Sequence, residues 1–141
     1  MTTRTVAEVM TEQVMSVPTT APVRQAAEVM RDNDIGDVVV VDDGVVRGVL
    51  TDRDMVIRVL ADNKEPNAVT VGEVYSANVV VAQADTTIDD AVRAMRDRAV
   101  RRLPVVDREG RPVGVVSIGD FARSEDPHSA LADISDAPPN T

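Results

Sequence analysis

The sequence predicts an α/β fold, with α+β character, built from two tandem β-α-β-β-α repeats, and three observations support this. A shift of 65 positions aligns the segment 6–10 with the segment 71–75, and the register holds over nearly the whole repeat. Valine-rich runs of strand length alternate with segments whose apolar residues recur at helical spacing. Each repeat closes with a glycine, two apolar residues, a hydroxyl residue and, three positions later, an aspartate. The chain is therefore an internal duplication of one domain.

Each repeat begins with a short helical turn, an apolar strand and an amphipathic helix. The turns and strands are predicted at 6–10, 14–17, 71–75 and 79–82. The helices are predicted at about 22–33 and 87–98, where apolar residues at i, i+3, i+4 and i+7 form one stripe that faces a core. Pro22 suits a first helical turn, and Thr87 with Asp90 forms a capping box.

Two strands around a tight turn and a closing helix complete each repeat. The strands are predicted at 37–42, 45–51, 103–107 and 112–117. The first pair flanks Asp43-Gly44, which is a strong hairpin signal, and the second pair flanks the turn 108–110. The closing helices are predicted at about 52–62 and 118–124.

The repeats place the domain boundaries at 1–62 and 71–124, with a linker at 63–70 that contains Pro66. Residues 125–141 include acidic residues but no lysine or arginine, and they are predicted to form a disordered tail. The core must be aliphatic, because the 43% hydrophobic fraction includes only one tyrosine and one phenylalanine.

The composition excludes several classes of function. A net charge of -9 argues against binding to nucleic acid or to a membrane surface, since both depend on basic residues. The chain has no cysteine, so disulfides and thiolate chemistry are excluded, and its one histidine, His128, lies in the predicted tail, where no metal site is expected. No nucleophile is paired with a base, so the chain is not predicted to be an enzyme. It has no signal peptide and no apolar run of about 18–20 residues, which predicts a soluble cytoplasmic protein.

Two further motifs carry a family resemblance. Arg101-Arg102-Leu103-Pro104 leads into Val105-Val106-Asp107, and Val9-Met10-Thr11 lies at the start of the first repeat. Together with the duplication, these motifs resemble a pair of cystathionine-β-synthase (CBS) domains, packed as a pseudo-two-fold Bateman module, over about 6–123. Because the pair fills the chain, it is similar to the stand-alone two-CBS proteins of bacteria, such as the hypoxic response protein type of actinobacteria, which implies a stress response.

The resemblance implies a regulatory module rather than an enzyme. CBS pairs bind AMP, ADP, ATP or S-adenosylmethionine in clefts between the repeats, require no cofactor, commonly form homodimers and signal to a regulated protein. In the family, the aspartate of the closing motif holds the ribose hydroxyls, and its Thr or Ser lies near the phosphate. By position these roles fall on Asp54 and Thr51, and on Asp120 and Ser117.

The chemistry of the residues supports a ligand at these two turns. A helix that begins just after Thr51 or Ser117 presents unpaired backbone N–H groups, which form a ready anion site. Arg53, Arg101 and Arg102 are suited to neutralise phosphate. The candidates for an apolar adenine slot are Val17, Ile35, Val38, Ala82, Val100 and Leu103. The predicted ligand-binding set is Thr51, Arg53, Asp54, Val100, Arg101, Arg102, Leu103, Pro104, Ser117 and Asp120.

The two repeats are unequal at one place. Arg101-Arg102-Leu103-Pro104 is matched in the first repeat by Gly36-Asp37-Val38-Val39, which replaces two positive charges with one negative charge and lacks the proline. Asp37 would repel a phosphate. We therefore expect at most one well-formed nucleotide site, built chiefly on Ser117 and Asp120, and which repeat supplies the phosphate contacts stays open.

Alternatives to each of these readings remain open. Both hydroxyl–aspartate pairs are also ordinary helix caps, and the paired arginines suit a solvated corner equally well. The alternative function is an interaction or structural protein whose clefts bind no ligand. Dimerisation is expected through the apolar faces of the closing helices, with Met55, Val56, Val59 and Leu60 as candidates.

Overall fold

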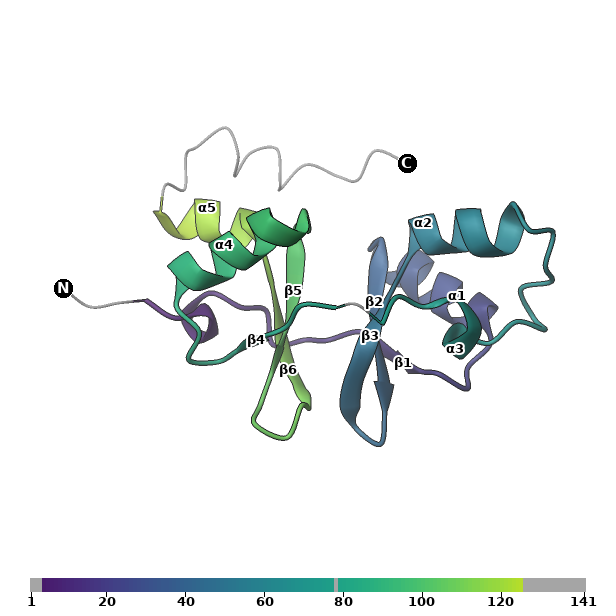
Figure 1. Cartoon of the computed structure of the whole chain (residues 1–141), viewed down its shortest axis with the longest axis horizontal. Helices are drawn as coiled ribbons and strands as arrows, with labels where there is room; N and C mark the ends of the chain where they lie inside the picture. Colours follow the sequence, from purple (N-terminus) through teal and green to yellow (C-terminus); the bar gives the residue numbers. More distant parts are fainter. Residues whose placement is uncertain (1–3, 78, 126–141) are drawn as a thin grey trace. The chain divides into compact units, whose positions relative to one another are not determined.

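The computed structural model describes residues 4–77 and 79–125, and its contacts divide the chain into two compact units. The first unit comprises Met15–Val79, and the second comprises Met1–Val14 together with Val80–Thr141 (Figure 1). Each unit therefore contains the opening turn of the other repeat. The repeats are consecutive in the sequence, but they exchange their opening segments in packing.

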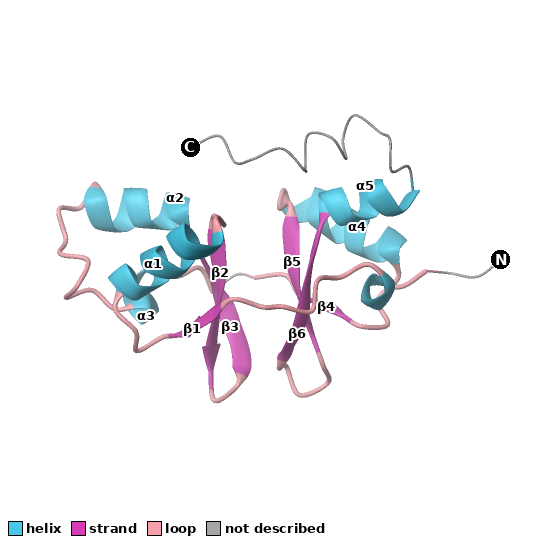
Figure 2. Cartoon of the chain, turned by 180° about the vertical axis from the view of Figure 1, so that it is seen from behind, coloured by secondary structure: helices cyan, strands magenta, loops and turns pink. Residues whose placement is uncertain are grey.

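The first unit is a three-stranded sheet with helices on one side of it (Figure 2). The strands are β1 (Ser16–Pro18), β2 (Asp37–Asp42) and β3 (Val45–Thr51), in the order β1-β2-β3. The helices are α1 (Val23–Asn33), α2 (Asp52–Met55), η2 (Val56–Leu60) and α3 (Val71–Val74). β1 runs parallel to β2, and β2 runs antiparallel to β3.

The second unit repeats this arrangement. The strands are β4 (Ala82–Gln83), β5 (Arg102–Val106) and β6 (Pro112–Ser117), in the order β4-β5-β6. The helices are η1 (Val6–Glu8), α4 (Ile88–Arg98) and α5 (Ile118–Glu125). The central strand is again parallel to the first strand and antiparallel to the last. The register shift falls between Val40 and Val41 in one hairpin and at the equivalent Val105 and Val106 in the other, so the duplication extends to this irregularity.

Most of the predicted elements are confirmed, and one differs in type. α1 and α4 each begin within one residue of their predicted start, and Asp43-Gly44 forms the predicted tight turn with both φ angles positive, at 51° and 78°. The helix predicted at 52–62 starts as an α-helix but continues as a π-helix over Val56–Leu60, where the Ala61 N–H bonds to the Val56 carbonyl at 2.9 Å. A π-helical turn is wider than an α-helical one, which changes which side chains face the core.

The exchanged turns are bonded into their units through the backbone. In the second unit, the Val6 N–H donates to the Thr86 carbonyl at 2.9 Å, and the Val6 side chain is fully buried. In the first unit, Thr70 caps the N-terminus of α3, and its N–H and hydroxyl donate to the Glu73 carboxylate at 2.7 and 3.0 Å. These bonds favour the charged carboxylate and lower the pKa of Glu73. Each opening turn is thus an integral part of the unit that receives it.

Both glycines of the closing motifs allow these exchanged segments to cross a strand. A Cβ at Gly48 would overlap the Ser76 carbonyl and meet the Tyr75 ring at 2.8 Å, and one at Gly114 would meet the Met10 Sδ at 2.6 Å. At the same places, the Val49 N–H bonds to the Ser76 carbonyl at 3.1 Å. The glycine that opens each closing motif is therefore needed for packing, because a side chain there would clash with the exchanged segment.

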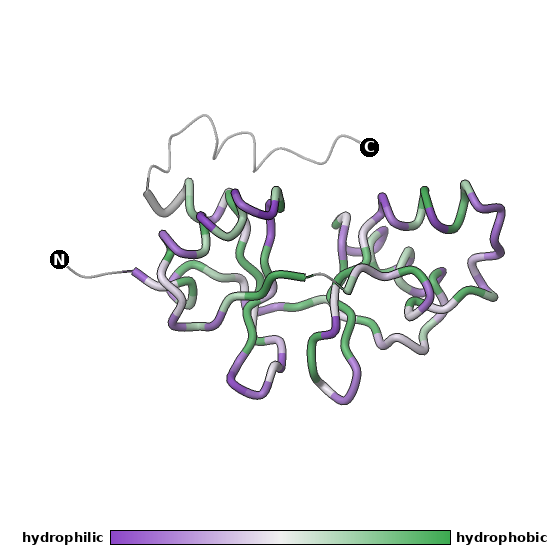
Figure 3. The backbone as a smooth tube through the Cα atoms, in the orientation of Figure 1, coloured by the Kyte–Doolittle hydropathy of each residue, from purple (hydrophilic) through white to green (hydrophobic). Residues whose placement is uncertain are grey.

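The two cores are aliphatic, as the composition predicts. Val40 and Leu50 are fully buried in the first unit, and Val105 and Val116 are fully buried in the second. The hydrophobic segments of the trace follow the strands in both units (Figure 3). The second core also includes the single phenylalanine, Phe121, on α5. Each sheet therefore holds its closing turn in a fixed position, at the end of the last strand.

Candidate functional site

The turn at Thr51 is a complete capping box. The Asp54 N–H donates to the Thr51 hydroxyl oxygen at 3.0 Å, and the Thr51 N–H donates to Asp54 Oδ2 at 3.0 Å. The hydroxyl and the carboxylate therefore satisfy one another's backbone donors, which typically stabilises a helix start by about 1 kcal/mol. The capping interpretation of the motif is confirmed at this turn.

The turn at Ser117 has the same cap. The Ser117 N–H donates to Asp120 Oδ2 at 2.8 Å, and the Asp120 N–H donates to the Ser117 hydroxyl oxygen at 3.2 Å. A cap does not exclude a ligand, because each carboxylate oxygen accepts more than one hydrogen bond and the serine hydroxyl keeps its own proton to donate. The two interpretations of the motif are therefore compatible at one turn.

The remaining first-turn N–H groups differ between the two turns. In the first unit, the Asp52 N–H donates to the Gly36 carbonyl at 2.9 Å, and the Arg53 N–H donates to Asp52 Oδ1 at 2.8 Å. With the Asp54 N–H held by the cap, each N–H of residues 52–54 has a partner. The prediction of unpaired donors after Thr51 is therefore wrong, and the reason is the carboxylate of Asp52.

In the second unit, glycine replaces arginine at the middle of these three positions. The Ile118 N–H donates to the Arg101 carbonyl at 3.0 Å, whereas the N–H of the buried Gly119 has no hydrogen-bond partner among the residues that the structure describes. A buried donor without a partner costs free energy. The second turn thus keeps one backbone donor for which an anion is a suitable partner.

Pro104 produces a second difference, in the parallel pairing of each sheet. In the first unit, the Val39 N–H donates to the Met15 carbonyl at 3.0 Å. Pro104 occupies the equivalent position in β5 and has no N–H, so the Val80 carbonyl accepts no hydrogen bond from any residue in the described ranges. β4 is accordingly one residue shorter than β1, and the strand predicted at 79–82 begins only at Ala82.

The predicted adenine slot is mostly core. Val17, Val38, Ala82 and Leu103 are at most 4% exposed. Their side chains fill the interior of their own unit, so the expectation that they line a slot is corrected, and Leu103 can offer a ligand only its backbone. Two apolar side chains of the second unit remain open, Val81 at 40% and Val100 at 38% exposed. Val100 precedes Arg101, whose carbonyl accepts from the Ile118 N–H of the second turn.

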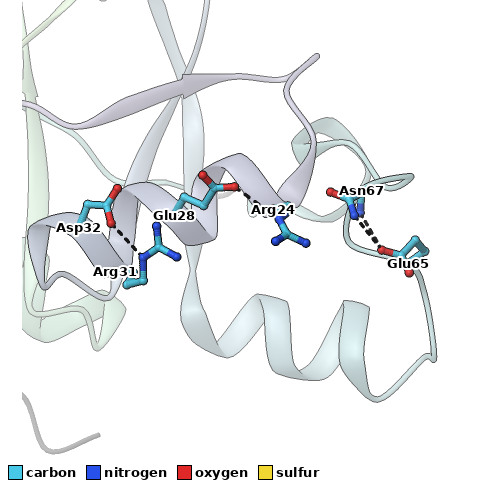
Figure 4. A network of polar contacts seen from close by, with 6 residues as sticks. All are labelled: Arg24, Glu28, Arg31, Asp32, Glu65 and Asn67. Carbon is cyan, nitrogen blue, oxygen red and sulfur yellow. Dashed lines mark hydrogen bonds and ion pairs between the residues drawn. The ribbon is translucent and has the colours of Figure 1, made fainter.

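The segments that lead into the central strands carry opposite charge. We call residues 31–37 the first corner; it contains one arginine and three aspartates. The arginine is already paired, because Arg31 Nε lies 2.9 Å from Asp32 Oδ1, a bond that also raises the pKa of Arg31 (Figure 4). The other pairs in this region, Arg24 with Glu28 and Asn67 with Glu65, also lie on the surface (Figure 4). The first corner offers an anion no attraction.

We call residues 96–102 the second corner; it contains four arginines and one aspartate, and all seven residues are exposed. Arg96, Arg98 and Arg101 form no ion pair with any residue in the described part of the chain. The corner lies beside the second turn, because Arg102 is paired with Ser117 in the sheet and the Arg101 carbonyl accepts from Ile118. A basic segment and an unpaired N–H therefore adjoin one another in this unit.

The predicted site residues fall into two groups. Val100, Arg101, Arg102, Leu103, Pro104, Ser117 and Asp120 lie together in the second unit, and Thr51, Arg53 and Asp54 lie in the first. Arg53 also lines a shallow hollow of about 350 Å³ with Asp52, Val56 and Ile57, on the helix beyond the cap. The sequence reasoning missed Gly119, Val80 and Val81. For the first two the signal was present, since Gly119 aligns with Arg53, and Pro104 predicts a lost strand hydrogen bond.

A family model for the CBS domain matches the chain twice, at residues 6–61 and 71–126. The chain belongs to the CBS domain family. The CBS domain-containing protein YhcV of Bacillus subtilis (strain 168) is 36% identical over 134 residues, which are 92% of this chain and 94% of that protein. Hypoxic response protein 1 of Mycobacterium tuberculosis is 38% identical over 107 residues, 75% of this chain and 74% of its own length. The family resemblance is confirmed.

Solved structures confirm the predicted fold of a tandem CBS pair. Hypoxic Response Protein I, solved with two coordinated zinc ions, gives a TM-score of 0.78 at 36% identity and covers 88% of this chain and 99% of its own. The CBS domain pair of protein MJ0100, solved with 5′-methylthioadenosine and S-adenosyl-L-methionine, gives a TM-score of 0.78 at 25% identity, covering 91% and 100%. In the described part of this chain, no three His, Cys, Asp or Glu side chains are grouped so that they could hold a metal ion.

Proposed function

We propose that this CBS pair is a regulatory module that binds an adenosine ligand, AMP, ADP, ATP or S-adenosylmethionine, and signals its occupancy to a protein partner. The observation that carries the proposal is the second turn, where a hydroxyl, a carboxylate, an unpaired N–H and a basic corner adjoin in one unit. The MJ0100 pair, a structural neighbour, was solved with two ligands of this class. Ligand can act as a signal only by binding one arrangement of the module more tightly than another.

Each residue of the second turn has a role in this proposal. Asp120 accepts hydrogen bonds from the ribose hydroxyls, as the acidic residue of dinucleotide folds does. The Ser117 hydroxyl and the Gly119 N–H donate to a phosphate or carboxylate oxygen, and Arg101 and Arg102 supply charge. The exposed Val100 contacts the adenine face, while Leu103 and Pro104 shape the backbone of β5 beneath it.

The first turn forms a weaker site. Thr51 and Asp54 repeat the chemistry of the cap, but Asp52 occupies the adjacent N–H group, and the first corner is acidic. An anionic ligand would meet repulsion there, and Arg53 alone would oppose it. We therefore propose one ligand per chain, bound at Ser117 and Asp120.

Calorimetric titration of the full chain with AMP, ADP, ATP and S-adenosylmethionine tests this function. Asp120→Ala should abolish saturable binding, and Asp54→Ala, which removes an equivalent cap, should bind like the parent. Because each variant loses the same capping interaction, a difference between them reports on the ligand rather than on stability. Equal binding by the parent and Asp120→Ala would remove the proposed ribose role, and a folded parent that binds no ligand would reject the function.

The alternative function, an interaction protein whose sites bind no ligand, is favoured by one surface. On η2, Val56, Ile57 and Leu60 are 54%, 46% and 67% exposed and form an apolar face. Val59 was expected there, but it is 2% exposed and belongs to the core, and Met55 is partly buried against that core. We propose that this face joins two copies into a homodimer. Sedimentation equilibrium should show a dimer for the parent and a monomer for Leu60→Ser. A dimeric parent that binds none of the four adenosine ligands would support the alternative.

The proposed setting is a cytoplasmic stress response without a nucleic-acid or membrane partner. A relative at 38% identity is called Hypoxic response protein 1, which supports the stress response. The net charge of -9 opposes contact with nucleic acid and anionic lipid alike. In the described ranges, every helix is too short or too polar to cross a membrane.

A further inference from the structure

We propose that the second corner selects the ligand by its negative charge, so that the module binds adenosine 5′-phosphates, ATP and ADP before AMP, and discriminates against S-adenosylmethionine. This inference rests on the proposed function, since it concerns which adenosine ligand the same turn takes. It separates this chain from its neighbour MJ0100, whose CBS pair was solved with S-adenosyl-L-methionine and 5′-methylthioadenosine.

The equivalent segments of the two repeats carry opposite charge. Residues 31–37 carry three aspartates and one arginine, while residues 96–102 carry four arginines and one aspartate. Both segments contain the end of a helix and its left-handed C-cap residue, Asp34 or Ala99, and both lead into the central strand of a sheet. The left-handed helix end is shared and the charge is reversed, so this backbone conformation requires neither sign of charge.

Three arginines of the second corner, Arg96, Arg98 and Arg101, are available to a ligand. In the first corner the single arginine, Arg31, is already paired, because its Nε lies 2.9 Å from Asp32 Oδ1. In the second, Arg96, Arg98 and Arg101 are exposed and form no ion pair within the described ranges, although the chain as a whole is strongly acidic. Several like charges on one short segment repel one another, and a bound polyanion relieves that repulsion.

The position of this charge matters as much as its amount. Arg101 and Arg102 are joined to the second turn through the Ile118 N–H and the pairing with Ser117, so the charge lies where the first turn of α5 begins. A ligand whose ribose is held by Asp120 extends its 5′ substituent from that point. A phosphate chain there is attracted by the corner, whereas the sulfonium and ammonium groups of S-adenosylmethionine are repelled.

The test is a competition series on the full chain with uncharged adenosine as the reference ligand. At low salt we expect ATP to bind at least tenfold more tightly than adenosine and S-adenosylmethionine, with ADP close to ATP and AMP between. Added sodium chloride should weaken ATP binding steeply and leave adenosine binding nearly unchanged, because salt screens charge.

Arg98→Gln/Arg101→Gln should lower the affinity for ATP about tenfold and leave that for adenosine unchanged. The matched control is Arg108→Gln/Arg111→Gln, which removes two positive charges from the same unit at the opposite end of the β5–β6 hairpin and should bind ATP like the parent. Equal losses in both variants would show a general charge effect and overturn the proposed corner.

The outcomes separate this inference from the function beneath it. S-adenosylmethionine or 5′-methylthioadenosine binding as tightly as ATP would overturn charge selection and leave an adenosine-binding module intact. A folded chain that binds none of these ligands would reject the function, and the selection with it. ATP binding that survives in both arginine variants, with its salt dependence, would place the attracting charge elsewhere and overturn the role of the second corner.

Discussion

The turns at Thr51 and Ser117 share a backbone, a cap and a supporting sheet, yet they differ in the N–H groups of the first helical turn and in the charge of the adjoining corner. The first turn has a partner for each N–H of residues 52–54 and adjoins an acidic corner. The second keeps the Gly119 N–H unpaired and adjoins a basic corner. Duplication has therefore preserved what the fold requires and changed what surrounds it. The shared features belong to stability, and the differences are where function is to be sought.

The largest expected effect is at Gly48 and Gly114, the two glycines that let an exchanged segment cross a strand. Substituting them should destabilise the two units by different amounts. In Gly48→Ala the new methyl overlaps the backbone carbonyl of Ser76, which has to move. In Gly114→Ala it meets the flexible side chain of Met10 at 2.6 Å and the Thr11 carbonyl at 2.9 Å, a milder backbone clash than in the first unit. We expect Gly48→Ala to lower the free energy of unfolding by about 3 kcal/mol and Gly114→Ala by about 1–2 kcal/mol. Urea denaturation followed by circular dichroism measures both.

Two results would count against this packing. Equal losses would mean that the flexibility of Met10 gives the second unit no advantage. A neutral Gly48→Ala would mean that residues 75–76 do not cross β3 in solution, and with that the exchanged opening segments would be in doubt.

This crossing also marks the limit of what the sequence predicts about the fold. The duplication, the hairpin at Asp43-Gly44 and the helices α1 and α4 follow from period and turn chemistry, which are local properties. The exchange of η1 and α3 between repeats does not follow, because both opening segments are similar and either could pack with either repeat. The glycines that permit the crossing are visible in the sequence, but their partner segments are not.

The candidate site shows the same limit at smaller scale. The motif predicted the hydroxyl and carboxylate positions, and the capping alternative predicted their hydrogen bonds. It did not predict that Asp52 would occupy the Arg53 N–H, because that bond depends on a side-chain rotamer. Nor did it predict that Leu103 is buried, because an apolar residue at a strand start suits a slot or a core equally well.

Pro104 of β5 accounts for a difference of one hydrogen bond between the two sheets, and exchanging proline and valine tests it. Val39→Pro should remove the bond from the Val39 N–H to the Met15 carbonyl and give the first sheet the shorter pairing of the second. Leaving that acceptor unsatisfied costs roughly 2 kcal/mol of the free energy of unfolding. The reverse change, Pro104→Val, restores a donor for the Val80 carbonyl and should stabilise the second unit by about 0.5–1 kcal/mol.

Hydrogen exchange monitored by NMR distinguishes the two sheets in these variants. Proline has no amide hydrogen, so Pro104→Val introduces a new one, and protection of this amide from exchange, in the absence of ligand, would show the new bond directly. If Val39→Pro is as stable as the parent, the Met15 carbonyl finds another donor, and the difference in length between β1 and β4 has a cause other than proline.

The smallest effect concerns the residue within each corner that ends the preceding helix. Both α1 and α4 end at a residue in the left-handed region, Asp34 with φ 56° and Ala99 with φ 54°. Aspartate tolerates this conformation better than alanine does, so the first repeat adopts the left-handed helix end at a lower cost in free energy. Ala99→Gly should therefore raise the free energy of unfolding by roughly 0.5–1 kcal/mol, because relief of the strained φ exceeds the added freedom of the unfolded chain.

A series of substitutions at position 99 tests this prediction more strictly than a single variant does. Ala99 is exposed, so Gly, Asn and Val differ there mainly in how they accept a positive φ. The expected order of stability is Gly, then Asn, then the parent, then Val, whose branched Cβ is the least compatible. Urea midpoints at one pH measure the order. An Ala99→Gly variant less stable than the parent would mean that the second corner does not hold this conformation in solution, and the equivalence of the two corners would fail at their helix C-caps.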